Sequence, residues 1–404
     1  MISSLTYGGR NGGITMANFK ITDSVTYVGV DDKDIDLFES QYDVPNGMAY
    51  NSYIIFDEKI AVMDTVDARK TDEWLANVEA ALDGKTPDYL VVDHVEPDHS
   101  GSFMAIVEKY PDMKVVGNVK TFMFLSQFFE NMDIDDRKVV VADGDELSLG
   151  SHNLKFIFAA MIHWPEVMVT FEQSEGILFA ADAFGKFGAL DTDEDWACEA
   201  RRYYFNIVGK YGLQVQGLLK KAAALDIKKI LPLHGPVLTE NLGYYIDKYQ
   251  TWSSYTPEDK GITIAYASIH GNTAKAAKEL ADMLEKKGAE KVSLFDLSRD
   301  DVAEAVEDAF RYDRLVLMSS SYDSGVFPAM EYFLVKLKAK TYRKRTIAIV
   351  ENGSWAPSAG RVIKSYVDQF KDIDLIEPMV TIRSSLTAQS REQLEKLADK
   401  LVNA

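Results

Sequence analysis

The order of apolar and polar residues divides the chain into two parts. In the first part, apolar runs at 25–30, 52–56 and 60–64 predict strands, and the polar residues 57–59 predict a tight hairpin turn. Further strands then alternate with stretches of helical periodicity as far as a predicted helix over 242–252. Such alternation favours a sandwich of sheets with helices outside.

The second part begins after a polar segment at 253–260, which contains Pro257 and predicts a domain linker. The apolar run 262–267 is typical of a buried parallel strand, and a helix is predicted over 274–286. Four more strand–helix units start with strands at 291–297, 314–319, 346–351 and 375–380. Together they predict a doubly wound parallel sheet of five strands over 261–404.

A loop rich in histidine and acid follows the apolar strand 89–92. It holds His94, Glu96, Asp98 and His99, at the carboxyl end of a strand, where α/β proteins place their chemistry. Alternate residues of an extended segment point the same way. We therefore expect the side chains of residues 94, 96 and 98 on one side, with His99 available to a second ion.

Three more ligand-type residues follow later apolar runs: His163, Asp182 and His234. The chain has only six histidines, and four of them belong to this ordered set, which predicts a two-metal site. Of the other two, His152 is predicted in an exposed turn and His270 in a solvent-facing loop.

In their order, these seven residues resemble the ligand set of the metallo-β-lactamase fold and, more closely, that of the flavodiiron proteins. The resemblance implies an αββα sandwich with two irons per chain. His94, Glu96 and His163 would hold one iron, Asp98, His99 and His234 the other, and Asp182 would bridge them. Hydrolytic zinc members usually carry histidine in place of Glu96, and a carboxylate, as the harder ligand, shifts the preference from zinc toward iron or manganese.

The first loop of the second domain is rich in groups that donate to phosphate. It consists of Ser268, Ile269, His270, Gly271, Asn272 and Thr273, and it opens a helix whose N-terminal N–H groups can bind a phosphate. It contains no lysine and does not match the nucleoside-triphosphate loop. It resembles the phosphate loop of flavodoxins, which implies FMN as the cofactor.

Flavodoxins also contact the flavin through the loops after the third and fourth strands. The resemblance implies the same role for the loops after the third and fourth predicted strands of the second domain. The residues concerned are Ser320, Ser321, Tyr322, Asp323, Ser324, Gly325, Asn352, Gly353, Ser354, Trp355 and Ala356. Trp355 is predicted to stack on the isoalloxazine ring. The loop after the third strand lacks the Pro-Thr pair of many flavodoxins, so its contacts stay open.

The composition narrows the classes of partner and cellular location that fit this chain. A net charge of −19 argues against nucleic acid, and no apolar run is long enough for a membrane helix. Residues 1–15 lack an apolar secretory segment, so we expect a cytoplasmic protein with a non-functional extension before Met16. The one cysteine, Cys198, excludes a cysteine-ligated iron centre within the chain and is expected to pack as a small apolar residue. Trp164, Phe184 and Phe187 flank the proposed ligands and could line an apolar pocket for a gas.

Over 16–404 the chain resembles the two-domain flavodiiron proteins, with a diiron domain at 16–252 and an FMN domain at 261–404. The resemblance implies reduction of O2 to water, of NO to N2O, or of both. It also implies rubredoxin or a similar small protein as donor, and a head-to-tail homodimer or a dimer of such dimers. Two alternatives remain: a zinc hydrolase with an accessory flavodoxin domain, and an electron-transfer flavoprotein whose metal site is only structural.

Overall fold

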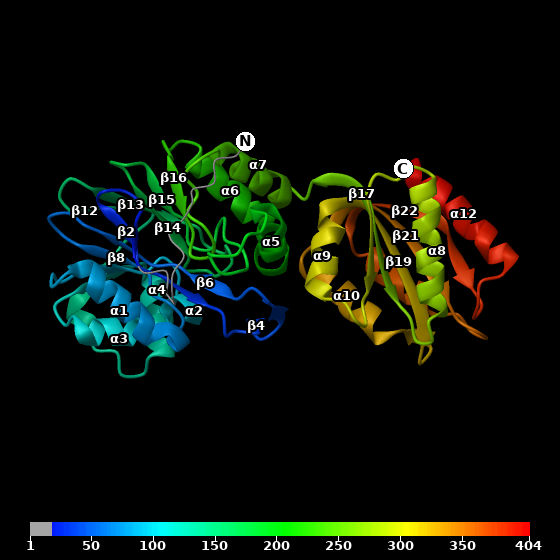
Figure 1. Cartoon of the computed structure of the whole chain (residues 1–404), viewed down its shortest axis with the longest axis horizontal. Coiled ribbons are helices and arrows are strands. Elements are labelled where there is room, and N and C mark those ends of the chain that lie inside the picture. Colours follow the sequence, from blue (N-terminus) through cyan, green and yellow to red (C-terminus); the bar gives the residue numbers. More distant parts are fainter. Residues whose placement is uncertain (1–17) are drawn as a thin grey trace, which may run out of the picture.

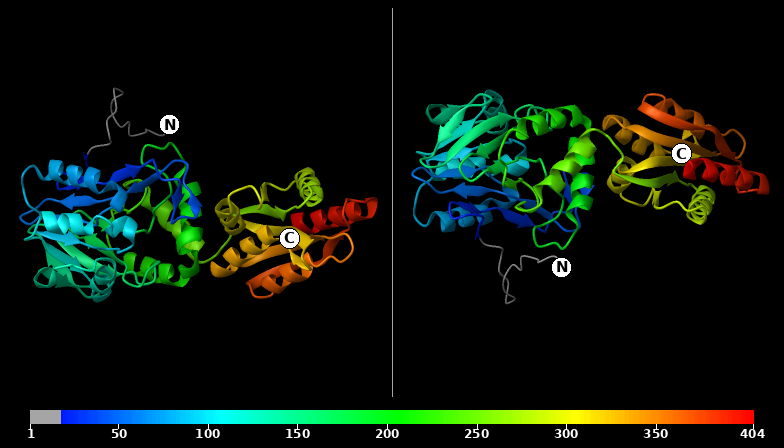
Figure 2. Two further views of the ribbon diagram at one scale, coloured as in Figure 1. Left: turned by 90° about the horizontal axis from the view of Figure 1, so that it is seen from below. Right: turned by 90° about the horizontal axis from the view of Figure 1, so that it is seen from above.

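A computed structural model describes residues 18–404, and the predicted extension 1–15 and start at Met16 lie outside this range. Two domains lie side by side and are joined by one short connection (Figures 1 and 2). No helix among the described residues is long and apolar enough to cross a membrane.

The first domain contains two facing sheets, which confirms the predicted sandwich. The first sheet has the order β1 (Phe19–Lys20), β2 (Val25–Tyr27), β7 (Tyr53–Ile55), β8 (Ala61–Met63), β9 (Tyr89–Val91), β10 (Lys114–Gly117) and β11 (Lys138–Val140). The second has the order β12 (Glu146–Ser148), β13 (Asn153–Phe158), β14 (Met168–Glu172), β15 (Ile177–Phe179) and β16 (Lys229–Leu231). Their facing sides form a shared buried core that includes Tyr53, Met63, Phe156 and Phe179.

Helices cover the outer side of each sheet (Figure 1). Near the first sheet are η1 (Ala68–Lys70), α1 (Thr71–Leu82), α2 (Pro97–Ser100), α3 (Phe103–Lys109), α4 (Val119–Phe128) and η2 (Asp135–Arg137). The second sheet is followed by α5 (Trp196–Tyr203), the π-helical turn η3 (Tyr204–Val208), η4 (Gly209–Tyr211), α6 (Gly212–Ala222) and α7 (Leu242–Ser253). Two small sheets pair β3 (Val30–Asp32) with β6 (Met48–Tyr50), and β4 (Leu37–Phe38) with β5 (Tyr42–Asp43).

The predicted single strand at 25–30 is wrong, because the chain leaves the first sheet after Tyr27. A Cβ atom at Gly29 would lie 2.4 Å from the Tyr50 carbonyl oxygen, so only glycine allows the close approach made there. The chain then continues as β3 in a different sheet.

The second domain is doubly wound, as predicted. Its sheet has the order β18 (Val292–Asp296), β17 (Asp259–Ala267), β19 (Tyr312–Tyr322), β21 (Arg343–Asn352) and β22 (Lys371–Ile382), all parallel, and the short β20 (Gly325–Val326) pairs antiparallel with the end of β19. Its helices are α8 (Asn272–Lys286), α9 (Val302–Arg311), α10 (Pro328–Ala339), α11 (Ala359–Val367) and α12 (Ala388–Val402). The sheet thus holds the five predicted parallel strands and one short extra strand.

The connection between the domains is shorter than the predicted 253–260. Helix α7 continues through Ser253, and Asp259 already pairs with Tyr312 in the second sheet. Glu258 is held firmly between the domains, because its carboxylate accepts hydrogen bonds from Arg201 Nε at 2.8 Å and Trp252 Nε1 at 2.6 Å.

The domains also pack against each other directly. Arg201 on α5 bonds to Glu307 on α9, and the rings of Phe205 and Phe310 stack with centroids 4.3 Å apart. Buried ionic and aromatic contacts therefore fix how the second domain sits on the first.

Two residue-level predictions for the first domain are wrong. Cys198 is exposed, because it lies on the outward side of α5. His152 is nearly buried, because Asp57 Oδ2 lies 2.8 Å from its Nδ1 and Glu175 Oε1 lies 3.2 Å from its Nε2. Each ring nitrogen has its own carboxylate partner, so this histidine links three turns of the chain.

Candidate metal centre and flavin pocket

The ligand side chains of the histidine-acid loop point in two directions. The prediction that this loop is extended is therefore wrong. The backbone stays irregular through Glu96 and then turns into the short helix α2, which carries Asp98 and His99. Asp98 therefore does not share a side with His94 and Glu96. The loop places one pair of ligands in each of two groups.

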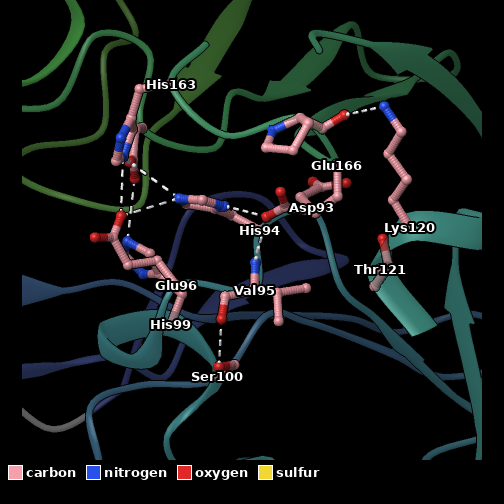
Figure 3. A network of polar contacts seen from close by, with 12 residues as sticks. Asp93, His94, Val95, Glu96, His99, Ser100, Lys120, Thr121, His163 and Glu166 are labelled. Carbon is pink, nitrogen blue, oxygen red and sulfur yellow. Dashed lines mark hydrogen bonds and ion pairs between the residues drawn. The ribbon is translucent and has the colours of Figure 1, made fainter. Parts of the chain in front are cut away.

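The first group contains His94, Glu96, His163 and Asp182, whose ligand atoms all lie within 4.8 Å of one another. Glu96 Oε2 lies 3.2 Å from His94 Nε2 and 2.9 Å from His163 Nε2 (Figure 3). Asp182 Oδ2 lies 3.1 Å from the same His163 nitrogen. Two imidazoles and two carboxylates thus converge on one small volume.

The second group contains Asp98, His99 and His234, all buried. Asp98 Oδ2 lies 3.3 Å from His99 Nε2 and 3.2 Å from His234 Nε2. The two Nε2 atoms are themselves only 3.1 Å apart. A neutral imidazole can bind a metal ion through the lone pair of Nε2. The Nε2 lone pairs of His99 and His234 can therefore be directed at a single ion.

Asp182 connects the two groups, because its two oxygens face opposite ways. Oδ2 belongs to the first group, while Oδ1 lies 3.0 Å from His99 Nε2 in the second. Burial alone would raise the pKa of the Asp182 carboxyl, but His94, His163 and His99 hold it well below its usual range. The carboxylate is therefore ionised and directed at both groups.

Backbone and carboxylate groups outside the predicted set orient the histidines. His94 Nδ1 lies 2.8 Å from Glu166 Oε1, and His234 Nδ1 lies 2.8 Å from the Ala49 carbonyl oxygen. Hydrogen bonds at Nδ1 leave Nε2 free to face the site. Asp64 Oδ1 accepts from the N–H groups of Asp93 and His94, which fixes the loop itself. No spacing rule points to Glu166, although it lies three residues after His163.

The donor set fits a pair of metal ions. Both carboxylate oxygens of Asp98, and Oδ1 of Asp182, are buried without a hydrogen-bond partner. Buried carboxylate oxygens are costly unless something compensates their charge. The mixture of four imidazoles and three carboxylates suits iron or manganese better than zinc.

The three aromatic residues near the ligands do not share a pocket, so that prediction is wrong. The Trp164 ring lies against His94 and His163, at centroid distances of 5.6 and 6.4 Å. Phe187 packs with Tyr203, whereas Phe184 packs against Tyr249 at an interplanar angle of 31° and lines a separate apolar cavity.

The second domain has a pocket of about 530 Å³ at the carboxyl ends of its strands. The predicted residues Ile269, His270, Asn272, Thr273, Ser320, Ser321, Tyr322, Asp323, Ser324, Asn352, Gly353, Ser354, Trp355 and Ala356 line it, together with Ser358 and Ser384, which the sequence analysis missed. Ser268, Gly271 and Gly325 do not line it.

The predicted residues that miss the pocket shape its loops instead. Ser268 Oγ accepts from the Gly271 N–H at 3.1 Å, and Gly271 has a φ of 83°, which favours glycine just before α8. Thr273 Oγ1 and Ser320 Oγ lie 2.9 Å apart at the start of that helix. His270 is exposed, as predicted.

The pocket suits a flat, polar ligand with a phosphate. The helix start and its hydroxyl groups supply donors to an anion. Trp355 is 88% exposed at the rim, so its ring is available to stack on a flat ligand. Two buried groups of metal-ligand type in one domain and a flavin-type pocket in the other are the features of a two-domain metalloflavoprotein.

The comparisons with known proteins agree with this class. Residues 48–235 match the ODP family beta lactamase model, and residues 263–378 match a flavodoxin domain. The nitric oxide reductase of Moorella thermoacetica is 30% identical over 94% of this chain and 97% of its own length.

Two solved structures superpose over nearly the whole chain. Rubredoxin oxygen:oxidoreductase from Desulfovibrio gigas is 25% identical and has a TM-score of 0.88, covering 96% of this chain and 98% of its own. The flavodiiron protein from Giardia intestinalis has a TM-score of 0.90 at 24% identity and covers 97% of both chains. The chain belongs to the flavodiiron protein family.

Proposed function

We propose that this protein reduces O2, NO or both at a pair of iron ions held in the first domain, with electrons delivered through FMN in the second. The observation that carries this proposal is the division of Asp182 between two ligand groups, Oδ1 toward one and Oδ2 toward the other. A zinc hydrolase is not favoured, because the first group contains Glu96 and the relatives are reductases.

The ligands would be shared as the two groups suggest. His94, Glu96 and His163 would hold one iron, and Asp98, His99 and His234 the other, with Asp182 between them. When bound, iron would supply a centre that binds and polarises a diatomic, and FMN would supply electrons. The chain itself keeps the Glu96 and Asp182 carboxylates ionised, orients His94 and His234 through their Nδ1 atoms, and buries most of the set away from bulk water.

Metal analysis and turnover test this proposal together. Protein purified without oxygen should contain about two iron ions and one FMN per chain, and should consume O2 or NO when its flavin is reduced. A protein that holds zinc, or that reduces neither gas with iron and FMN bound, would contradict it.

We also infer a head-to-tail dimer in which the flavin of one chain serves the iron centre of its partner. Apolar side chains are exposed near both sites. On the first domain, Phe128 is 46% exposed and stacks on Trp164, which contacts two of the ligands. On the second, Trp355 is 88% and Tyr322 46% exposed at the flavin pocket. Two-fold pairing would cover each patch with the other.

Co-expression of two inactive variants tests the pairing. His94→Ala removes an iron ligand. Thr273→Val combined with Ser268→Ala removes two hydroxyls from the phosphate loop, and its homodimer is made inactive by assay at FMN concentrations too low to fill the weakened pocket. If electrons pass between chains, heterodimers should regain activity at one of their two sites, while each homodimer stays inactive. Heterodimers that form but remain inactive would contradict the pairing.

A rubredoxin or similar protein would be the donor. The support is the likeness to the rubredoxin oxygen:oxidoreductase of Desulfovibrio gigas, which is named for its use of rubredoxin. This chain has a single cysteine and therefore cannot hold a four-cysteine iron site itself. Reduced rubredoxin should reduce the bound FMN in rapid-mixing experiments. Failure of reduced rubredoxin, with dithionite still effective, would direct the search to another donor.

A further inference from the structure

We propose that an apolar cavity between the second sheet and helices α6 and α7 binds small apolar gas molecules and conducts them to the metal centre. The cavity has a volume of about 270 Å³. The conducting role rests on the proposed function, whereas the binding of a gas does not.

The cavity lies on the outer side of the second sheet, away from the core shared by the two sheets. Its floor is made by Ile157 of β13, Val169 of β14 and Leu178 of β15. Its roof includes Leu218 and Ala222 of α6. Of the α6 residues that line the cavity, Val215 is buried, whereas Leu218, Leu219 and Ala222 are half-buried.

The cavity has almost no capacity for water. Tyr249 is the one lining residue with a polar side chain, and its hydroxyl already accepts a hydrogen bond from the Phe184 N–H at 2.6 Å. A buried water needs two to four polar partners, and apolar cavities of this kind stay dry and take up xenon or benzene. The lining therefore favours a small apolar guest over water or a charged metabolite.

Two residues of the cavity lining are chain neighbours of proposed metal ligands. Ile162 and Ala183 line the cavity, and they adjoin His163 and Asp182 in the chain. Both ligands belong to the first metal group. Each of them is therefore directly bonded in the chain to a residue that lines the cavity. Ala223, just after α6, also lines the cavity and is exposed, which gives a guest a way in from the surface.

The size and chemistry of the cavity select the guest. It is larger than the engineered apolar cavities of about 150 Å³ that hold benzene or xenon. O2 and NO are small and nearly apolar, so they leave water for such a space without losing hydrogen bonds. A local store beside the metal centre would raise the encounter rate with the gas at low concentration.

Xenon tests the site independently of activity. Crystals of the iron- and FMN-loaded protein, pressurised with xenon, should show xenon in this cavity. Ala222→Phe fills the space from the half-buried side of α6, where a larger side chain can be accommodated, and should abolish the xenon peak. Ala224→Phe, on an exposed position just beyond α6, is the matched control and should keep it.

Rapid mixing then tests the route. In Ala222→Phe, the second-order rate of reoxidation of the reduced protein by O2 or NO should fall several-fold, while the rate at saturating gas stays unchanged. Ala224→Phe should match the wild type in both. Absence of xenon from the wild-type cavity would overturn the proposal, and so would xenon binding with an unaltered gas rate in Ala222→Phe. An inactive wild type that still binds xenon would instead refute the proposed function.

Discussion

The metal centre and the flavin pocket are built in opposite ways. The seven proposed metal ligands are mostly buried, and each of their charged or polar atoms faces another across 2.9 to 3.8 Å. The flavin pocket is open and lined with hydroxyl and amide groups, and its most prominent ring, Trp355, stands 88% exposed. The first site is pre-formed by the fold, whereas the second is an open pocket that a ligand would fill.

This difference predicts how each site responds to mutation. Removing one group from a buried, mutually dependent cluster leaves charges uncompensated, so the whole cluster should fail. Removing one donor from an open pocket leaves a group that water can satisfy, so the loss should be limited to one hydrogen bond.

The largest effect is expected for Asp182→Ala. Because this carboxylate faces both ligand groups, its loss should abolish binding of both irons and lower gas reduction by at least about a hundredfold. Iron content and steady-state turnover measure this. Asp191→Ala, at an exposed acid paired with Lys33, is the control and should keep iron and activity. Full iron in Asp182→Ala would show that the ligand assignment is wrong.

Glu166→Gln should have the next largest effect. The amide keeps the shape but no longer offers a charged acceptor to His94 Nδ1, and loss of such a partner costs roughly 10- to 100-fold in metal affinity or activity. Iron affinity by competition with a chelator and the reduction potential of the centre should both change. Glu172→Gln, at a buried acid on β14 away from the ligands, is the control. Equal effects of the two variants would indicate a purely structural role.

Thr273→Val should weaken FMN binding by roughly tenfold, the equivalent of one net hydrogen bond. The variant keeps the volume of a residue that is only 1% exposed but removes its hydroxyl, which lies 2.9 Å from Ser320 Oγ. Flavin fluorescence titration of the flavin-free protein measures the affinity. Thr263→Val, in the middle of β17, should leave it unchanged. Complete loss of flavin would mean that the pocket is as interdependent as the metal centre.

The smallest effect concerns the contact that joins the two regions. Burial alone would raise the pKa of Glu258, but Arg201 and Lys248 lower it to about 2, from an ordinary value of 4.5. A group whose pKa is lowered on folding contributes stability above its unfolded pKa and loses it as the pH falls toward the folded pKa. The free energy of unfolding of the wild type should therefore exceed that of Glu258→Gln near neutral pH, and this difference should disappear between about pH 5 and pH 2.

Thermal unfolding of the metal-free protein at a series of pH values measures this advantage, which is at most about 3 kcal/mol near neutral pH. Glu279→Gln, at an exposed acid paired with Arg391, should show little change at any pH. A constant difference between wild type and Glu258→Gln down to low pH would show that the ionised carboxylate does not matter.

The sequence could predict both domains and all seven residues of the two metal groups, because each of these residues follows an apolar strand and the chain has only six histidines. It could not predict the path of the loop, since α2 depends on tertiary contacts such as the Thr65 hydroxyl donating to the His99 carbonyl oxygen at 2.6 Å. The sequence also could not predict the role of Glu166, because its partner, His94, lies 72 residues earlier.

The same limit explains the errors on isolated residues. His152 looks like an exposed turn histidine until turns distant in the sequence bring Asp57 and Glu175 to it. In the flavin domain, the phosphate loop is local and could be found, whereas Ser384 joins the pocket from the end of another strand. Local patterns predict elements and ligands, and only the packed chain decides which distant groups meet.

The most direct test of the central claim is the oxidation of fully reduced, iron- and FMN-loaded protein by O2 and by NO in a stopped-flow instrument, with the products analysed. We predict rapid reoxidation that yields water without free hydrogen peroxide, or N2O, and that is lost in Asp182→Ala even when its FMN is bound and reduced. Equally rapid oxidation of that variant, with peroxide as the product from both proteins, would show that the flavin alone reacts with the gas and would contradict a catalytic diiron centre.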